Sequence, residues 1–421
     1  MKVLNKPARL LLLISICSSL FNLTYSQNPL KEFRFKNDKK SSFTLPFKLI
    51  NNLMVIPVSI NNSDSLNFIL DTGVTTSILT DIEGIDSIIL NYVREINLRG
   101  LGKGEDIKAI HSYGNEIGIG ELIGRNQDIF VLNDANLKLS SKLGFPVHGI
   151  LGFTVFSNFI VYINYDRKLI KFYKSDEFKD SRKYRKFKTL QFTFHDSKPY
   201  INLEMIDYLG KSYLIKLLMD TGASHTIWLD PGSKINGLKI PEKTTLTYLG
   251  SGLNGDIYGY LGRMPKVILE GNAMNNVIIS FPDSLSIAKI LGSEGRNGSI
   301  GSEILKRFNM LIDYPNNKLL IKPNSHFHNN FNQNLSGMEL ITPMPEYRYY
   351  IIYKVRENSP ADKAGLRAGD IIEMINYVRT VGFSLSEIYE IFQSSPGKKL
   401  IIQYQRDGKY FTTSLKLEKY I

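Results

Sequence analysis

The sequence predicts a mainly β protein built from two homologous lobes and a small α+β module at the C-terminal end. An Asp-Thr-Gly triplet occurs twice, at residues 71–73 and 220–222, 149 residues apart. Two glycine pairs, within residues 149–152 and 298–301, repeat with the same spacing. Structural repeats of solenoid proteins have periods of about 20 to 50 residues. A period three times longer therefore indicates two duplicated lobes.

The N-terminus has the pattern of an export signal at residues 1–26. Lys2, Lys6 and Arg9 form a basic start, and an apolar core follows at Leu10–Leu20. This core is too short to span a bilayer comfortably. Small residues in Thr24-Tyr25-Ser26 fit a cleavage site. We therefore expect export, with the mature chain starting at Gln27.

Cys17, the sole cysteine, lies inside this apolar core. A lipidation site would need a small residue before the cysteine, whereas Ile16 is bulky, so the pattern favours cleavage over lipid anchoring at Cys17. The mature chain then contains no disulfide. Its formal charge falls from +12 to +9, because the three basic residues of the signal are removed.

The two lobes are expected at residues 42–175 and 191–324, after a polar leader at 27–41. Short alternating or β-branched runs, such as Leu53–Ile60, indicate strands, and Gly, Asn and Asp separate them. The basic stretch Lys174–Lys188 reads as a solvated connection between the lobes. A segment rich in Asn and His, about 324–334, reads as a second linker before the module at 337–421.

The triplets and their surroundings resemble retropepsin-like aspartic proteases. In that family a D-T-G-A/S-S/T loop follows an inner strand, and an apolar-apolar-Gly segment crosses beneath the loop. Here Ala223-Ser224 follows the second triplet in the usual form, whereas the first continues with the bulkier Val74 and then Thr75. Residues 147–152 and 298–304 match the crossing element. The resemblance covers most of residues 42–324 and implies a tandem, pepsin-like bilobal acid-protease fold.

The resemblance also implies the roles of the triplet residues. Asp71 and Asp220 would form the catalytic pair. Two adjacent carboxylates share one proton, so the ionised one can activate a water while the other donates to the peptide carbonyl. No cofactor and no metal is needed. The residues expected to support the pair are Thr72 and Thr221, reaching to the opposite lobe, Gly73 and Gly222, allowing close approach, and Thr75 and Ser224, bonding the outer carboxylate oxygens.

Two glycine-rich segments between triplet and crossing element are candidate flaps. They contain Gly102 and Gly104 in the first lobe, and Gly250 and Gly252 in the second. A glycine-rich hairpin can close over substrate and exclude water. The alternative is that both segments are ordinary β-turns, because glycine is the usual turn residue.

Residues 337–421 resemble a bacterial PDZ domain. Ser359-Pro360-Ala361 is followed by Ala364-Gly365-Leu366 and then by Gly369-Asp370 before an apolar run. PDZ folds bind extended peptides at a sheet edge and receive a C-terminal carboxylate on backbone amides. The resemblance implies a peptide or C-terminus as ligand, and thus a role in polypeptide recruitment.

Other chemistries find little support in the sequence. His326 and His328 are a lone pair in a linker, whereas structural zinc wants four ligands. There is no nucleophile elbow, no H-E-x-x-H helix and no phosphate-binding loop. The basic stretch lacks a stacking platform or reading motif, so no nucleic acid is expected as a partner. No membrane segment follows the signal.

The sequence thus predicts an exported aspartic endopeptidase that hydrolyses polypeptides and carries a PDZ domain. It would act in the periplasm, at the envelope or outside the cell. A bacterial source is favoured, because the glycosylation sequon Asn297-Gly298-Ser299 falls in a segment that the family buries. Two alternatives stay open. One is a catalytically silent peptide-binding protein, and the other is a homodimeric protease that uses Asp220 alone.

Overall fold

A computed structural model describes residues 31–80, 88–98, 107–132, 138–179, 182–230, 235, 237–238, 240–252, 255–283 and 295–421. The expected signal at 1–26 lies outside these residues. Within the described ranges, no helix combines the length and the apolar character needed to cross a membrane.

The first lobe is built on a nine-stranded sheet with the order β1-β9-β6-β10-β5-β4-β8-β7, where β3 also pairs with β4. Its strands are β1 (Glu32–Phe35), β3 (Lys48–Ile50), β4 (Leu53–Ile60), β5 (Leu66–Leu70), β6 (Ser77–Leu79), β7 (Val93–Leu98), β8 (Ile107–Ile119), β9 (Leu122–Leu132) and β10 (Gly149–Leu151). Two short helices, α1 (Leu139–Leu143) and α2 (Phe153–Ser157), flank β10.

The second lobe repeats this plan with an eight-stranded sheet in the order β14-β15-β16-β21-β17-β20-β19-β18. Its strands are β14 (Thr193–His195), β15 (Lys198–Ile206), β16 (Ser212–Met219), β17 (Ile227–Leu229), β18 (Thr245–Gly252), β19 (Gly255–Leu269), β20 (Asn272–Pro282) and β21 (Gly298–Ile300). Helix α4 (Ser302–Leu305) follows β21 just as α2 follows β10. The equivalent order of elements confirms the duplicated lobes.

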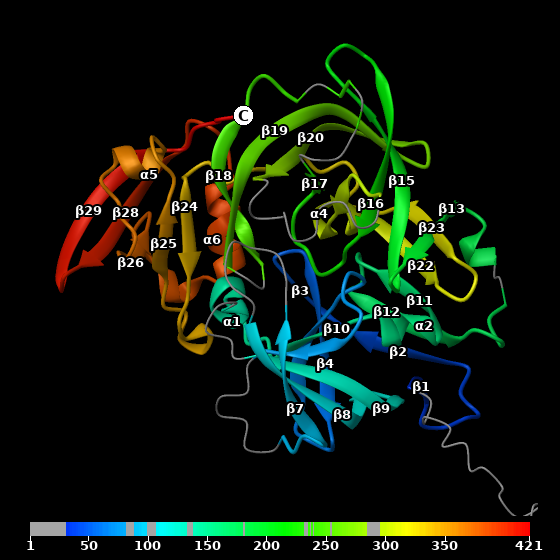
Figure 1. Cartoon of the computed structure of the whole chain (residues 1–421). Helices are drawn as coiled ribbons and strands as arrows, with labels where there is room; N and C mark the ends of the chain where they lie inside the picture. The colour runs from blue at the N-terminus through cyan, green and yellow to red at the C-terminus, as the bar shows by residue number, and fades with distance from the viewer. Residues whose placement is uncertain are drawn as a thin grey trace, which may run out of the picture. The chain divides into compact units, whose positions relative to one another are not determined.

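A third sheet is shared by both halves of the chain (Figure 1). Its order is β13-β23-β22-β11-β12-β2, with β2 (Ser42–Pro46), β11 (Phe159–Asn164), β12 (Leu169–Lys174), β13 (Lys188–Gln191), β22 (Phe308–Asp313) and β23 (Lys318–Pro323). At its centre β11 pairs antiparallel with β22, with Val161 opposite Ile312. The two lobes are therefore joined by continuous backbone hydrogen bonding.

The hydrophobic core of the lobes is continuous. One cluster of buried side chains contains residues of both lobes, among them Phe68, Met219 and Ile312, which are essentially inaccessible to solvent. On the other face of the shared sheet, Tyr184 of the short 3-10 helix η1 (Arg182–Tyr184) is 3% exposed. It packs edge-on against Tyr162 and Phe187. The connection between the lobes is therefore packed at Tyr184, while the basic side chains of Arg182, Lys183, Arg185 and Lys186 are exposed, as expected.

The C-terminal part folds around a core of its own. Its sheet has the order β24-β25-β26-β28-β29, and β27 pairs with β26. The elements are β24 (Met338–Ile341), η2 (Pro345–Tyr347), β25 (Ile351–Val355), α5 (Pro360–Lys363), β26 (Ile371–Ile375), β27 (Val378–Arg379), η3 (Thr380–Gly382), α6 (Leu385–Phe392), β28 (Lys399–Arg406) and β29 (Lys409–Lys416). Ser384 and Glu387 form a capping box that starts α6. The buried Leu366, Ile388 and Phe392 belong to the separate core.

The segment after the second lobe is held by a buried arginine. Arg307, only 1% exposed, lies between α4 and β22. Its guanidinium donates hydrogen bonds to the backbone carbonyls of Phe327, Asn329 and Asn330, among others. These carbonyls belong to the expected linker at 324–334, which is therefore fixed to the lobe.

Candidate active site

Both aspartates of the triplets lie directly after inner strands. β5 ends at Leu70 and pairs in parallel with β10, and the N–H of Asp71 donates to the carbonyl of Leu151 at 2.8 Å. In the second lobe β16 pairs in parallel with β21, and the N–H of Asp220 donates to the carbonyl of Ile300 at 3.0 Å. The glycine-containing strands thus fix the start of each aspartate loop in the same way.

The two triplet threonines join the lobes reciprocally. The hydroxyl of Thr72 donates to the carbonyl of Met219 at 2.6 Å, and the hydroxyl of Thr221 donates to the carbonyl of Leu70 at 2.9 Å. Each hydroxyl also accepts from the other threonine's N–H, at 3.0 and 3.1 Å. Both side chains are fully buried. The four bonds hold the two aspartate loops in a fixed relation.

The triplet glycines lie against the opposite carboxylates. A Cβ placed on Gly222 would come 2.1 Å from Cγ of Asp71, and one on Gly73 would come 3.1 Å from Cγ of Asp220. Asp71 and Asp220 also share a side-chain hydrogen bond. Asp71 accepts from the N–H of Gly73 at 2.6 Å, and Asp220 accepts from the N–H of Gly222 at 3.0 Å. Only glycine leaves room for this pair of carboxyl groups at position 222.

The crossing segments pass just as closely beneath the aspartate loops. A Cβ on Gly152 would come 2.0 Å from the carbonyl oxygen of Val74, and one on Gly301 would come 2.3 Å from that of His225. The backbone of Val74 accepts a hydrogen bond from Phe153 at 2.9 Å. The bulkier residue after the first triplet is thus accommodated, and the repeated glycines are explained by backbone contact.

The electrostatics of the pair are unequal. Burial first, and then the charge of Asp220, raise the pKa of Asp71 well above its usual value, although backbone hydrogen bonds oppose the shift. Burial also raises the pKa of Asp220, but a hydrogen bond from Asp71, backbone amides and the charge of Arg296 counteract it. Asp71 is buried, whereas Asp220 is partly exposed. The two carboxyl groups therefore titrate as a coupled pair that holds one proton between them.

Two residues that interact electrostatically with the pair were not expected from the sequence. Arg296 lies close enough to lower the pKa of Asp220, and its side chain is 3.6 Å from a carboxylate oxygen of Asp230. Tyr314 is buried among aromatic rings, and its hydroxyl has no hydrogen-bond partner among the described residues. Burial and the charge of Asp71 raise the pKa of Tyr314. The signal for Tyr314 was its repeat of Tyr165 at the same 149-residue spacing as the triplets, whereas Arg296 had none.

Thr75 and Ser224 lie next to the pair but are exposed. Among the hydrogen bonds of the described residues, neither hydroxyl contacts a carboxylate of the pair. The carbonyl of Ser224 accepts instead from the side chain of Asn52 of the first lobe, at 3.0 Å. The supporting role expected for these two hydroxyls therefore stays a prediction.

The candidate flap of the second lobe is a β-hairpin. Gly250 and Gly252 lie on β18 near its end, and Gly252 pairs with Gly255 at the start of β19. Gly250 has a φ of 139°, which other residues rarely adopt. The candidate flap of the first lobe, with Gly102 and Gly104, lies outside the described residues.

Three histidines that the sequence offered as candidate site residues have other surroundings in the structure. Burial lowers the pKa of His225 to about 3, its ring stacks on Trp228, and its Nε2 is 3.0 Å from the hydroxyl of Ser299. The linker holding His326 and His328 contributes backbone carbonyls to Arg307. Over the described ranges, no group of three or more His, Cys, Asp or Glu side chains is arranged to hold a metal ion.

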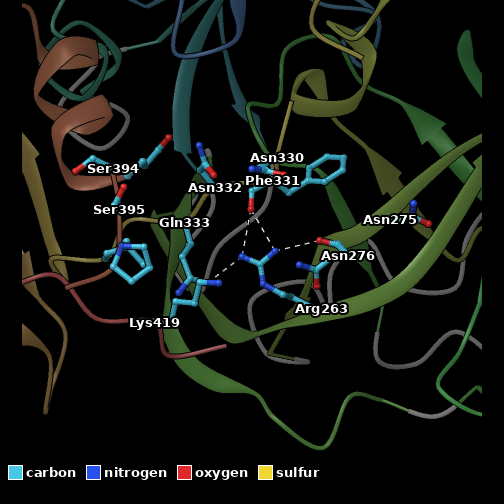
Figure 2. A pocket seen from close by; sticks show the side chains of 13 residues that line it. Arg263, Asn275, Asn276, Asn330, Phe331, Asn332, Gln333, Ser394, Ser395 and Lys419 are labelled. Carbon is cyan, nitrogen blue, oxygen red and sulfur yellow. Dashed lines mark hydrogen bonds between the residues drawn. The ribbon is translucent and has the colours of Figure 1, made fainter. Parts of the chain in front are cut away.

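A cavity of about 470 Å³ lies elsewhere, where the linker meets β19, β20 and the C-terminal domain (Figure 2). Arg263 lines the cavity, and its guanidinium donates hydrogen bonds to the carbonyls of Asn276 and Phe331. The other residues that line the cavity carry mostly amide and hydroxyl side chains. None of the predicted site residues lines it. Arg263 therefore acts as a second attachment of the linker, and the cavity is separate from the aspartate pair.

Comparison with known proteins identifies one part of the chain. A family model described as PDZ domain matches residues 351–406. Among solved structures, an aspartic proteinase from Irpex lacteus is similar over 69% of this chain and 99% of its own, with 14% identity and a TM-score of 0.40. A photosystem II D1 C-terminal processing protease is similar over 20% of this chain and 23% of its own, with 22% identity and a TM-score of 0.19. This chain spans about a quarter of that second protein.

The protein is thus mainly β, with two homologous lobes and a C-terminal PDZ domain. The shared sheet, the duplicated lobes and the facing triplets form the bilobal arrangement expected from the sequence.

Proposed function

We propose that this protein is a single-chain aspartic endopeptidase. The observation that supports it best is the hydrogen-bonded pair Asp71–Asp220, built by one triplet from each lobe and enclosed by Gly73 and Gly222. A pair of largely buried carboxyl groups with raised pKa values is costly to keep in a fold, and such pairs concentrate at catalytic sites. The extended polypeptide substrate would lie between the lobes.

One carboxyl of the pair would be ionised and the other protonated, and we assign the ionised state to Asp220 because the charge of Arg296 acts to lower its pKa. Asp220 would take a proton from a water molecule as that water attacks the peptide carbonyl. Asp71 would donate its proton to the carbonyl oxygen, giving a tetrahedral diol. Asp220 would then protonate the amide nitrogen as the C–N bond breaks, and Asp71 would regain its proton from the diol. No covalent intermediate and no cofactor is involved.

A cleavage assay on an unfolded protein substrate tests this proposal. Wild-type protein should cleave it, and a pepstatin-like inhibitor should abolish cleavage. Asp220→Asn should lose at least 1,000-fold in rate, because the water then has no base. Intact folding of the variant, checked by thermal unfolding, is the control. Cleavage that persists with the inhibitor and in the variant would contradict an aspartic mechanism.

Export and polypeptide recruitment complete the proposal. The signal pattern at 1–26 supports action in the bacterial envelope or outside the cell, and fractionation of cells with a tagged chain would test it. The PDZ domain supports binding of a peptide or C-terminus, since PDZ folds add an extended peptide to a sheet edge. A domain that binds the substrate raises its concentration near the aspartate pair.

A further inference from the structure

A hairpin of the second lobe places a carboxylate against the PDZ domain, beside an edge-on contact between the rings of Tyr248 and Tyr353. Asp256 lies at the start of β19, one residue from the hairpin end. Its Oδ2 accepts a hydrogen bond from the hydroxyl of Tyr353 at 2.8 Å and lies 2.9 Å from Nζ of Lys354. Both partners belong to β25 of the PDZ domain. Within the hairpin, the hydroxyl of Ser251 donates to Oδ1 at 2.7 Å.

The same hairpin end contacts the first lobe. Nζ of Lys142, on α1, donates to the hydroxyl of Ser251 at 2.5 Å and lies 3.9 Å from Oδ1 of Asp256. The hairpin therefore reaches from its own lobe to the opposite one, and the aspartate pair lies at the interface of these two lobes. Asp256 contacts both the first lobe, through Lys142, and the PDZ domain, through Tyr353 and Lys354.

The PDZ domain is itself fixed to the first lobe beside these contacts. The N–H of Thr342 donates to the carbonyl of Ser141 at 2.9 Å, and the hydroxyl of Ser386 donates to Asn51 at 2.8 Å. Leu385 packs so closely on Gly144 that a Cβ there would come within 2.6 Å of it. Because the PDZ domain is attached to the first lobe, strand β25 is held in a fixed position beside the hairpin.

The edge of the PDZ sheet is occupied by the protein's own groups. β24 is the edge strand. The N–H of Met338 donates to the hydroxyl of Ser336 at 3.1 Å, and the N–H of Leu340 donates to that of Tyr389 at 3.0 Å. These groups lie where a PDZ fold would add a peptide strand. In this conformation the domain's contacts are intramolecular.

The contacts of Asp256 favour its ionised form. Burial alone would raise the pKa of Asp256, but hydrogen bonds from Lys354, Ser251 and Tyr353 outweigh it and lower the pKa below its usual value. The stabilisation is therefore present above the usual pKa of an aspartate and is lost only as the pH falls through the lowered value.

We propose that Asp256 is a positioning residue, which ties the hairpin of β18 and β19 to β25 so that the PDZ domain sets the hairpin's place at the cleft. This inference rests on the proposed peptidase function. It gives the PDZ domain an effect on every substrate, including short peptides that never reach its sheet edge. Such an effect differs from recruitment, which acts only on substrates that the domain binds.

The test uses full-length point variants, because Ile421 packs into the core of the lobes and Thr245 of β18 bonds the carbonyl of Tyr420. Tyr353→Phe removes one hydrogen bond and leaves the ring. We expect it to raise KM for a short peptide about 5-fold, the equivalent of one lost hydrogen bond, with kcat within about 2-fold. The matched control is Tyr377→Phe in the same domain, where the side chain is 77% exposed, and it should change neither constant.

A double-mutant cycle with Asp256→Asn separates positioning from general destabilisation. The two variants remove one shared contact, so their effects on KM should be clearly less than additive. Additive effects, an unchanged KM, or a rise in kcat/KM would overturn the proposal. Hydrogen exchange gives a readout that does not depend on catalysis: amides of β18 and β19 should exchange faster in Tyr353→Phe than in the control. If the wild type cleaves nothing, faster exchange still supports the contact while the peptidase function fails, and unchanged exchange overturns the contact.

Discussion

At the scale of single residues, the site depends on side chains that satisfy buried backbone groups. Thr72 and Thr221 are fully buried, yet each hydroxyl both donates and accepts across the lobe interface. Gly222 leaves room for Asp71. These residues do no chemistry in the proposed reaction. They keep two carboxyl groups together that would otherwise repel and hydrate separately.

Thr72→Val tests the threonine contacts. It keeps the shape of the side chain but leaves the carbonyl of Met219 and the N–H of Thr221 buried without their partner, which should cost about 2–4 kcal/mol of unfolding free energy. Urea unfolding measures this. Thr72→Ser is the control, because it keeps the hydroxyl and loses only a methyl group worth about 1 kcal/mol. Equal costs for both variants would contradict the role of the hydroxyl.

Asp71→Asn tests the raised pKa through stability. The folded protein holds the proton of Asp71 more tightly than the unfolded chain, so the associated stability is full below a pH of about 4 and is lost as the pH rises through the raised pKa. The asparagine does not titrate. The melting temperature of the variant, relative to that of the wild type, should therefore be higher at pH 7 than at pH 4. Asp196→Asn, at an exposed position, is the control. If Asp71→Asn and the wild type differed in melting temperature by the same amount at both pH values, the raised pKa of Asp71 would be contradicted.

At the scale of elements, the contacts that the sequence could not predict are those between distant segments. The triplets and glycine pairs predicted the strands beside them, because their repeat is visible along the chain. Arg307 pairs with Glu303 four residues earlier, but its contacts with the linker gave no such signal, since they are made to backbone carbonyls that any sequence would provide. The composition of 324–334 indicated a linker, and the buried arginine explains why it is nevertheless fixed.

Arg307→Met tests that attachment. The variant leaves the carbonyls of Phe327, Asn329 and Asn330 without their donor, so we expect a loss of about 3–5 kcal/mol in unfolding free energy. Limited proteolysis under native conditions should cut within 324–334 faster than in the wild type. Arg307→Lys keeps the positive charge but has fewer hydrogen-bond donors, so its unfolding free energy and its cleavage rate should lie between those of the wild type and Arg307→Met. An unchanged cleavage rate in this segment would contradict the account.

At the scale of the whole molecule, the sequence predicted the parts better than their connections. The mainly β class, the two lobes and the PDZ domain followed from motifs that are local in the chain. The shared sheet and the contact of Asp256 with Tyr353 depend on pairing between residues far apart in sequence, which one sequence does not display. The effect of Arg296 on the pKa of Asp220 was unpredictable for the same reason, because the two residues are close in space but far apart in the sequence.

The central claim is that one chain supplies both carboxyl groups of one catalytic pair. The most direct measurement is cleavage by Asp71→Asn, by Asp220→Asn and by their equimolar mixture, with molecular mass determined under assay conditions. We predict a wild type that cleaves as a monomer, and no cleavage by either variant or by the mixture at any concentration. Activity retained in Asp71→Asn together with a dimeric mass would contradict the claim and establish a homodimer that uses Asp220 alone.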